Sequence, residues 1–110
     1  MSDEKSDDRC VLPIENSHNR LLFLCNYIVL YQNTPNPWSD RTDIKYFLPL
    51  SQDVVLTLYD VNGQKIYQEQ KTGDQGVNIT TLYNSDINQS GVLYYELVSG
   101  NTRLMHKMIV

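Results

Sequence analysis

The amino-acid sequence predicts an all-β fold, an antiparallel β-sandwich of about seven strands, over residues 28–110. Apolar and polar residues alternate with a period of two over several short stretches, which is typical of half-buried strands. Turn-forming residues separate these stretches at intervals of roughly eight to twelve residues. No stretch shows the period of a helix longer than one turn, so the sequence favours strands throughout this region.

The strands are expected to follow one another closely along the chain. The apolar run 28–30 leads in, and the later strands are expected over 42–48, 53–61, 64–70, 77–82, 92–99 and 103–110. A loop is expected over 72–76, and a looping connection with at most one helical turn over 83–90. The residues expected to fill the sandwich are Ile44, Tyr46, Leu48, Val54, Leu56, Leu58, Ile66, Leu82, Leu93, Tyr95 and Leu97, with Ile87 also inside.

Asn62-Gly63 is the clearest turn signal in the chain. Asn-Gly favours a type I′ hairpin turn, because that turn needs a positive φ at both central residues. We therefore expect the strands on either side to pair as an antiparallel hairpin. Asp60 precedes the turn, and its side chain is expected to bond the local backbone.

The segment Tyr31–Trp38 contains Pro35, Asn36 and Pro37. Each proline fixes φ and biases the preceding residue towards extended conformations. The segment is therefore expected to be a rigid, extended lead-in at the boundary of the folded domain. Trp38 is expected to pack at the end of the sandwich.

Composition excludes several functions. The net charge is -4, and a nucleic-acid partner would call for a basic surface. The apolar run 21–30 is too short to insert across a membrane. It also fits a signal peptide badly, because the preceding residues are acidic.

Residues 1–27 show no sustained period and are expected to be an irregular linker or a remnant of an upstream region. Cys10 and Cys25 both lie there, so unpaired cysteines are favoured over a disulfide. No Cys spacing supports a zinc site.

The sequence offers no catalytic or cofactor site. His18 and His106 are the two histidines, and neither belongs to a hydrolase or metalloprotease motif. Calcium binding by Asp40, Asp43 and Asp60 is disfavoured, since turn chemistry explains these residues better. The chain is therefore expected to be neither an enzyme nor a cofactor-binding protein, and its last strand is a candidate edge for a partner.

Five motifs occur together in a characteristic order. They are Tyr31–Trp38, Thr42–Pro49, Leu58–Gly63, Ser90–Tyr95 and Lys107–Val110. In this order they resemble the C-terminal sorting domain, type A, of the type IX secretion system of Bacteroidetes. The resemblance implies an Ig-like sandwich, similar to the Ig-like module of flagellar hook-capping proteins. It also implies a non-catalytic signal that targets attached upstream cargo across the outer membrane, from the periplasm to the cell surface or medium.

The resemblance further implies partners and recognition residues. The partners are the translocon and a sortase that removes the domain. Recognition maps onto Gly91, Tyr94, Tyr95, Lys107, Met108, Ile109 and Val110, although Leu93 stands where the family often has Tyr. Family members usually carry a signal peptide and a long cargo upstream, so the chain is expected to be a fragment, a remnant of a longer gene or an orphan reading frame. The alternative function is an Ig-like adhesion or assembly module acting at the cell surface.

Overall fold

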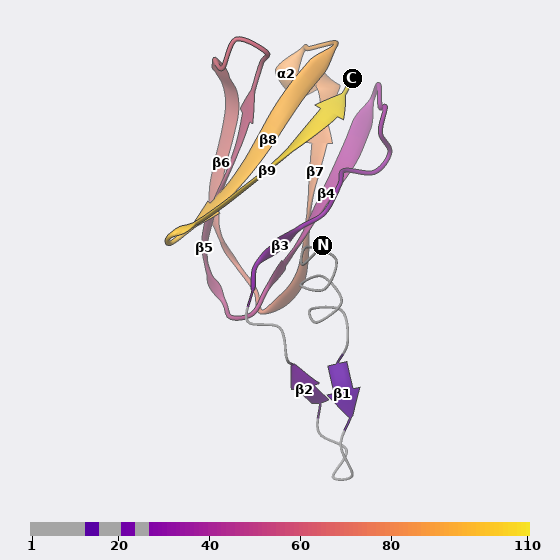
Figure 1. The fold of residues 1–110 in the computed structure, drawn as a ribbon. Coiled ribbons are helices and arrows are strands. Elements are labelled where there is room, and N and C mark those ends of the chain that lie inside the picture. Colours follow the sequence, from indigo (N-terminus) through magenta and orange to yellow (C-terminus); the bar gives the residue numbers. More distant parts are fainter. Residues whose placement is uncertain (1–12, 16–20, 24–26) are drawn as a thin grey trace, which may run out of the picture.

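A computed structural model describes residues 13–15, 21–23 and 27–110 (Figure 1). Strands β1 (Pro13–Glu15) and β2 (Leu21–Phe23) form a two-stranded antiparallel sheet. Cys10, Cys25 and His18 lie outside the described residues.

The remaining strands form two antiparallel sheets that pack face to face, as Figure 1 shows. The smaller sheet has the order β3-β4-β7, and the larger sheet has the order β6-β5-β8-β9. Their bounds are β3 (Val29–Leu30), β4 (Arg41–Leu48), β5 (Gln52–Tyr59), β6 (Lys65–Gly73), β7 (Gly76–Tyr83), β8 (Val92–Ser99) and β9 (Thr102–Ile109). The predicted seven-stranded sandwich is therefore confirmed, with strand ends within three residues of those expected.

Inward-facing side chains of both sheets form one core. All the side chains expected to fill the sandwich are buried except Ile66, which is half-buried because β6 is an edge strand. Leu30 and Met108 also belong to the core, although the sequence had not placed them there. Thr57, on the second face of β5, is also only 2% exposed, so the strand is covered on both sides at this position.

The β5–β6 hairpin forms as expected, but its turn is not type I′. Gly63 has a φ of +82°, whereas Asn62 does not have a positive φ. The Gly63 N–H donates to the Asp60 carbonyl at 3.0 Å, and the Asp60 N–H donates to the Gln64 carbonyl. This is the pattern of a three-residue loop that ends in a left-handed glycine. Asp60 explains the difference, because its Oδ1 accepts the N–H groups of both Asn62 and Gln64 at 2.9 Å.

The chain crosses from the larger to the smaller sheet between β6 and β7. The loop expected over 72–76 is shorter than predicted, since β6 extends to Gly73 and β7 begins at Gly76. Gly73 is buried, and a Cβ at this position would lie 2.5 Å from Leu48 Cδ1. The absence of a side chain therefore lets the strand pass close to β4.

The connection from β7 to β8 contains α2 (Asn84–Ile87), a single helical turn at the expected place. Ile87 from this turn is buried, and Asn88 ends it with a left-handed φ of 52°. In the part of the chain that the structure describes, no helix is long and apolar enough to cross a bilayer.

The lead-in segment, Tyr31–Trp38, is extended at its start and bent over residues 35–37. Tyr31 and Thr34 continue the antiparallel pairing of β3 with β4. Both X-Pro bonds, before Pro35 and Pro37, are cis. Buried Asn33 donates from Nδ2 to the Pro35 carbonyl and to Thr42 Oγ1, and Thr42 Oγ1 donates to the same carbonyl. These hydrogen bonds hold the bend against the start of β4, so the expectation of an extended segment was wrong for residues 35–37.

Candidate functional site

The terminal hairpin, β8 and β9, brings the predicted recognition residues together. Tyr94 lies opposite Lys107 in the register of the hairpin. Gly91 and Val110 exchange two backbone hydrogen bonds just beyond the strands, at 3.1 and 2.8 Å. Residues from two motifs that are well separated in sequence thus lie side by side in the terminal hairpin.

The predicted recognition residues differ in their exposure. Those with accessible surface are Gly91, Tyr94, Lys107, Ile109 and Val110. Met108 is fully buried in the sandwich core, opposite Leu93. Tyr95 is also fully buried. A partner that binds the folded domain can therefore touch the first set, whereas Met108 and Tyr95 act by holding the hairpin in place.

Tyr95 ties the hairpin to the lead-in segment. Its hydroxyl donates to the Tyr31 carbonyl at 2.7 Å. Burial raises the pKa of this hydroxyl to about 12. The neighbouring His106 makes a similar contact, because its Nε2 lies 2.7 Å from the Leu30 carbonyl. Since a carbonyl only accepts, Nε2 carries the proton in this contact.

The outer edge of β9 is covered at its C-terminal end. The backbone N–H of Trp38 donates to the Ile109 carbonyl at 3.1 Å, and the backbone N–H of Ile109 donates to Asn36 Oδ1 at 2.9 Å. Gln32 donates from Nε2 to the Lys107 carbonyl at 2.8 Å. The Trp38 ring is buried, and its indole N–H has no partner among the described residues, so the ring serves packing. The last strand is therefore not an open edge over its final residues.

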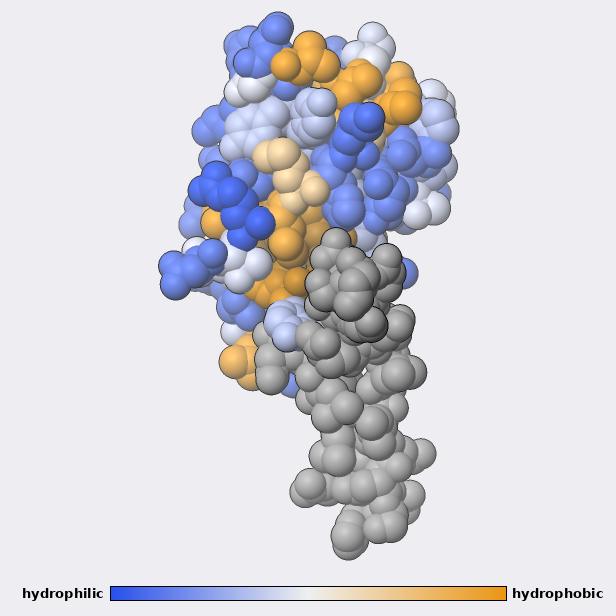
Figure 2. Space-filling view, viewed as in Figure 1, coloured by the Kyte–Doolittle hydropathy of each residue, from blue (hydrophilic) through white to orange (hydrophobic). Residues whose placement is uncertain are grey.

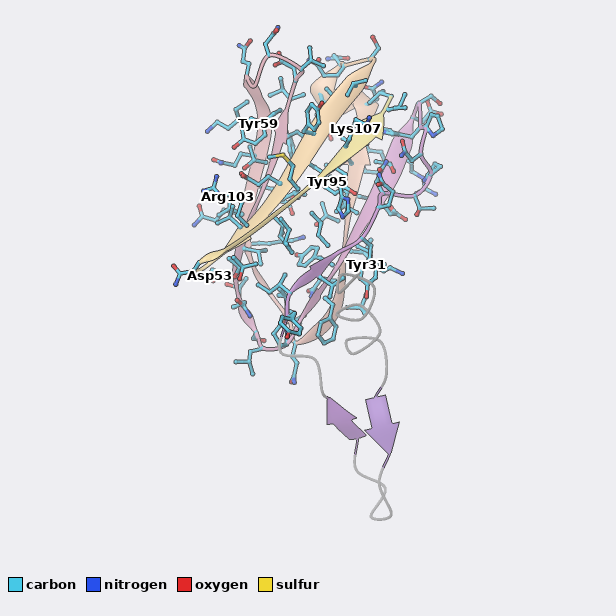
Figure 3. All side chains as sticks on the ribbon, viewed as in Figure 1. Tyr31, Asp53, Tyr59, Tyr95, Arg103 and Lys107 are labelled. Atoms are coloured by element: carbon cyan, nitrogen blue, oxygen red, sulfur yellow. The ribbon has the colours of Figure 1, made fainter. Side chains whose placement is uncertain are left out.

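Beside the recognition residues, the outer face of the larger sheet is hollowed. The depression has a volume of about 400 Å³ and is lined by Tyr59, Asp60, Val61, Gly63, Tyr94, Glu96, Arg103 and Met105. Figure 3 shows Tyr59, Arg103 and Lys107 near this face. In Figure 2, hydrophobic residues form a band down the middle of the view, with hydrophilic residues on either side.

A buried carboxylate forms the floor of this depression. Glu96 is 4% exposed and accepts a hydrogen bond from the Tyr59 hydroxyl at 3.1 Å. Its second oxygen lies 3.0 Å from Arg103 Nη1. Partial burial and the bond to Glu96 raise the pKa of the Tyr59 hydroxyl. No sequence pattern indicates this cluster of Tyr59, Glu96 and Arg103, because it depends on the pairing of β5 with β8.

Two of the three acidic residues considered for calcium have side-chain hydrogen bonds within the domain. Asp60 bonds the turn backbone, as expected, and Asp43 Oδ1 accepts from Thr81 Oγ1 at 2.8 Å. Within residues 27–110 and the two short strands before them, no three His, Cys, Asp or Glu side chains group as a metal site would require.

Comparison with known protein families identifies the chain. A family model described as a secretion system C-terminal sorting domain matches residues 34–110. The chain belongs to this family. The search of curated proteins and the search of solved structures each gave no match. The match of the sorting domain begins within the lead-in segment and continues through β9, so it includes both halves of the terminal hairpin.

Membership of this family gives the function of the sorting domain in outline. It is a non-catalytic secretion signal at the C-terminal end of a protein, which interacts with secretion machinery. The resemblance inferred from five sequence motifs is thereby confirmed. The family match leaves open which residues the machinery contacts.

Proposed function

We propose that this sorting domain directs an attached upstream protein through the type IX secretion system, across the outer membrane to the cell surface or medium. The translocon recognises the folded domain on the exposed part of the terminal hairpin. A sortase then removes the domain on the N-terminal side of the lead-in segment.

One observation carries the proposal: Tyr94, Lys107 and Ile109 share the outer face of the larger sheet, with Gly91 exposed beside them, whereas Val110 is half-buried against the core. Gly91 and Val110 are joined by backbone bonds, and Tyr94 lies opposite Lys107. The contacts of Asn36 and Trp38 with Ile109 hold the end of this surface in a fixed conformation. A rigid surface loses little conformational entropy when a partner binds, which favours recognition of the folded state.

Export of a reporter tests this proposal. The whole chain is fused to the C-terminus of a periplasmic reporter in a host with a type IX system, and reporter is measured outside the cell. The fusion is expected to be exported. The double variant Lys107→Ala/Ile109→Ser is expected to reduce export by about tenfold or more, since it removes two contact side chains.

The control variant is Lys45→Ala/Val77→Ser, which removes an exposed lysine and an exposed apolar residue from the smaller sheet, away from the hairpin. It should be exported normally, and both variants should keep the thermal unfolding temperature of the parent. A parent fusion that stays periplasmic would rule out the sorting function and favour a module that acts at its site. Equal export of the two variants would rule out only the assigned surface.

A further inference from the structure

The sandwich has four edge strands, and β7 differs from the other three. β3 has two residues, β6 carries Lys65, Glu69 and Lys71, and β9 carries Arg103 and Lys107. Short length and charged side chains are the devices that keep sheet edges from pairing with other chains. β7 has eight residues, Gly76–Tyr83, and contains neither a charged residue nor a proline. It therefore lacks the protection that the other edges have.

Hydrogen bonding shows which backbone groups of β7 face outward. On β4, Asp43 exchanges both backbone bonds with Thr34, and Lys45 accepts from Tyr31, so these odd-numbered residues bond on the β3 side. Bonds to the two sides alternate along an antiparallel strand. The even-numbered residues of β4 therefore bond β7, and their partners in the register are also even-numbered, as with Ile44 and Thr80.

The odd-numbered residues of β7 consequently direct their N–H and C=O groups away from the sheet. These residues are Val77, Ile79, Thr81 and Tyr83. The structure gives the backbone groups of Val77, Ile79 and Thr81 no hydrogen-bond partner within residues 27–110, whereas Tyr83 is the N-cap of α2. Figure 1 shows β7 running the length of the smaller sheet. Thus β7 offers an unpaired ladder from Val77 to Thr81.

The same residues place apolar side chains on the outer surface of the sheet. Val77 is 60% exposed, Ile79 is 57% exposed and Tyr83 is 47% exposed. A long, uncharged edge strand with exposed apolar side chains is a template for adding another strand.

From this edge we infer that two copies of the chain associate through antiparallel pairing of β7 with β7. The two-fold axis passes through Thr80, so that Ile79 lies opposite Thr81 of the second copy and Val77 lies opposite Tyr83. Ile79 and Thr81 then exchange both of their backbone bonds with the second copy, and Val77 lies next to the end of the shared ladder. The two smaller sheets become one continuous sheet across the dimer.

The chain itself fits this edge better than a charged peptide would. An antiparallel strand pairs with its own copy about a two-fold axis, which gives a closed dimer rather than a filament. β7 carries no charge, so self-pairing places no like charges opposite each other in the ladder, although the whole chain has a net charge of -4. The charged side chains that reach Thr80 from β6, Lys71 and Glu69, form an ion pair with each other at 2.9 Å. The Val77–Tyr83 pairs join an aromatic to a β-branched residue, a kind of pair that stabilises antiparallel strands.

Sedimentation of the full chain tests the inference. The average mass is expected to rise from the monomer mass of 12.8 kDa towards twice that value between about 10 µM and about 1 mM protein. Over the same range, the amides of Ile79 and Thr81 should become protected from hydrogen exchange. A chain that stays monomeric over this range would overturn the inference, as would a dimer in which these amides exchange as freely as in the monomer.

A matched pair of variants locates the interface. Ile79→Lys places a charge beside the two-fold axis and should weaken association at least about tenfold. Val61→Lys changes a residue of similar exposure, 64%, in the β5–β6 turn and should leave association unchanged. Both residues are exposed, so both variants should fold, which thermal unfolding verifies. Equal weakening by the two variants would show that net charge, not the β7 edge, controls association.

Discussion

Tyr95 links the terminal hairpin to the lead-in segment through one buried hydroxyl. The hydroxyl donates to the Tyr31 carbonyl, and the side chain is fully buried between the sheets. Because burial raises the pKa of this group to about 12, the folded protein favours the neutral hydroxyl more strongly than the unfolded chain, where the pKa is about 10. This group therefore contributes stability below about pH 10, and the contribution falls as the pH rises towards 12.

Tyr95→Phe should reveal this contribution. At pH 7 the variant should be less stable than the parent by about 1 kcal/mol, because the hydrogen bond is lost. At pH 11.5 the parent has lost on the order of 2 kcal/mol that the variant cannot lose, so the difference should vanish or reverse. Urea unfolding at both pH values measures it. A constant difference between parent and variant would contradict the raised pKa.

Individual buried residues could be predicted wherever alternation was regular. Val54, Leu56 and Leu58 occupy every second position of β5, and all three are in the core. Met108 was instead assigned to the recognition surface, because its motif resembles one read by the translocon. Burial of Met108 follows from β9 itself, where Lys107 and Ile109 on either side are exposed.

At the scale of the strand pair, the Asp60 side chain sets the β5–β6 turn. Two N–H groups of the loop bond its carboxylate, and Gly63 supplies the one positive φ that the loop needs. The sequence predicted the hairpin correctly, since Asn-Gly between two strands favours any tight connection. The predicted type I′ turn was wrong, because the turn type depends on the position of Asp60 relative to the last backbone hydrogen bond between the two strands.

Two substitutions separate the two turn types. Gly63→Val should lower the free energy of unfolding by about 1 kcal/mol or more, because a β-branched residue tolerates a positive φ poorly. No atom lies within 4 Å of a Cβ built at Gly63, so the cost is conformational rather than steric. Asn62→Ala should cost less than about 0.5 kcal/mol, as expected for an exposed residue without a positive φ. Urea unfolding measures the free energy of unfolding of both variants. A similarly large loss of stability in both would indicate a type I′ turn instead.

Strand pairs close in sequence were more predictable than pairs distant in sequence. The β5–β6 and β8–β9 hairpins follow from turn residues between adjacent runs. The pairing of β5 with β8 joins Tyr59 to Glu96 across 37 residues, and no local pattern specifies it. For this reason the predicted recognition residues could be taken from sequence motifs. The depression beside them could be recognised only in the folded structure.

At the scale of the whole molecule, the two sheets meet where the chain crosses at Gly73. The crossing is tight, since only Asp74 and Gln75 separate β6 from β7. Gly73 lies against Leu48 of β4, whose side chain is fully buried. The close approach thus couples the core packing of the smaller sheet to the path of the chain out of the larger sheet.

A double-mutant cycle tests this coupling. Gly73→Ala should destabilise the protein by about 1–3 kcal/mol, because the new Cβ would lie 2.5 Å from Leu48 Cδ1 in a packed core. Its φ lies outside the left-handed region, so alanine brings no backbone strain. Leu48→Val removes the Cδ atoms and alone should cost about 1 kcal/mol. In the Leu48→Val background the cost of Gly73→Ala should fall by about 1 kcal/mol, whereas additive costs would show that the crossing relaxes independently of the core.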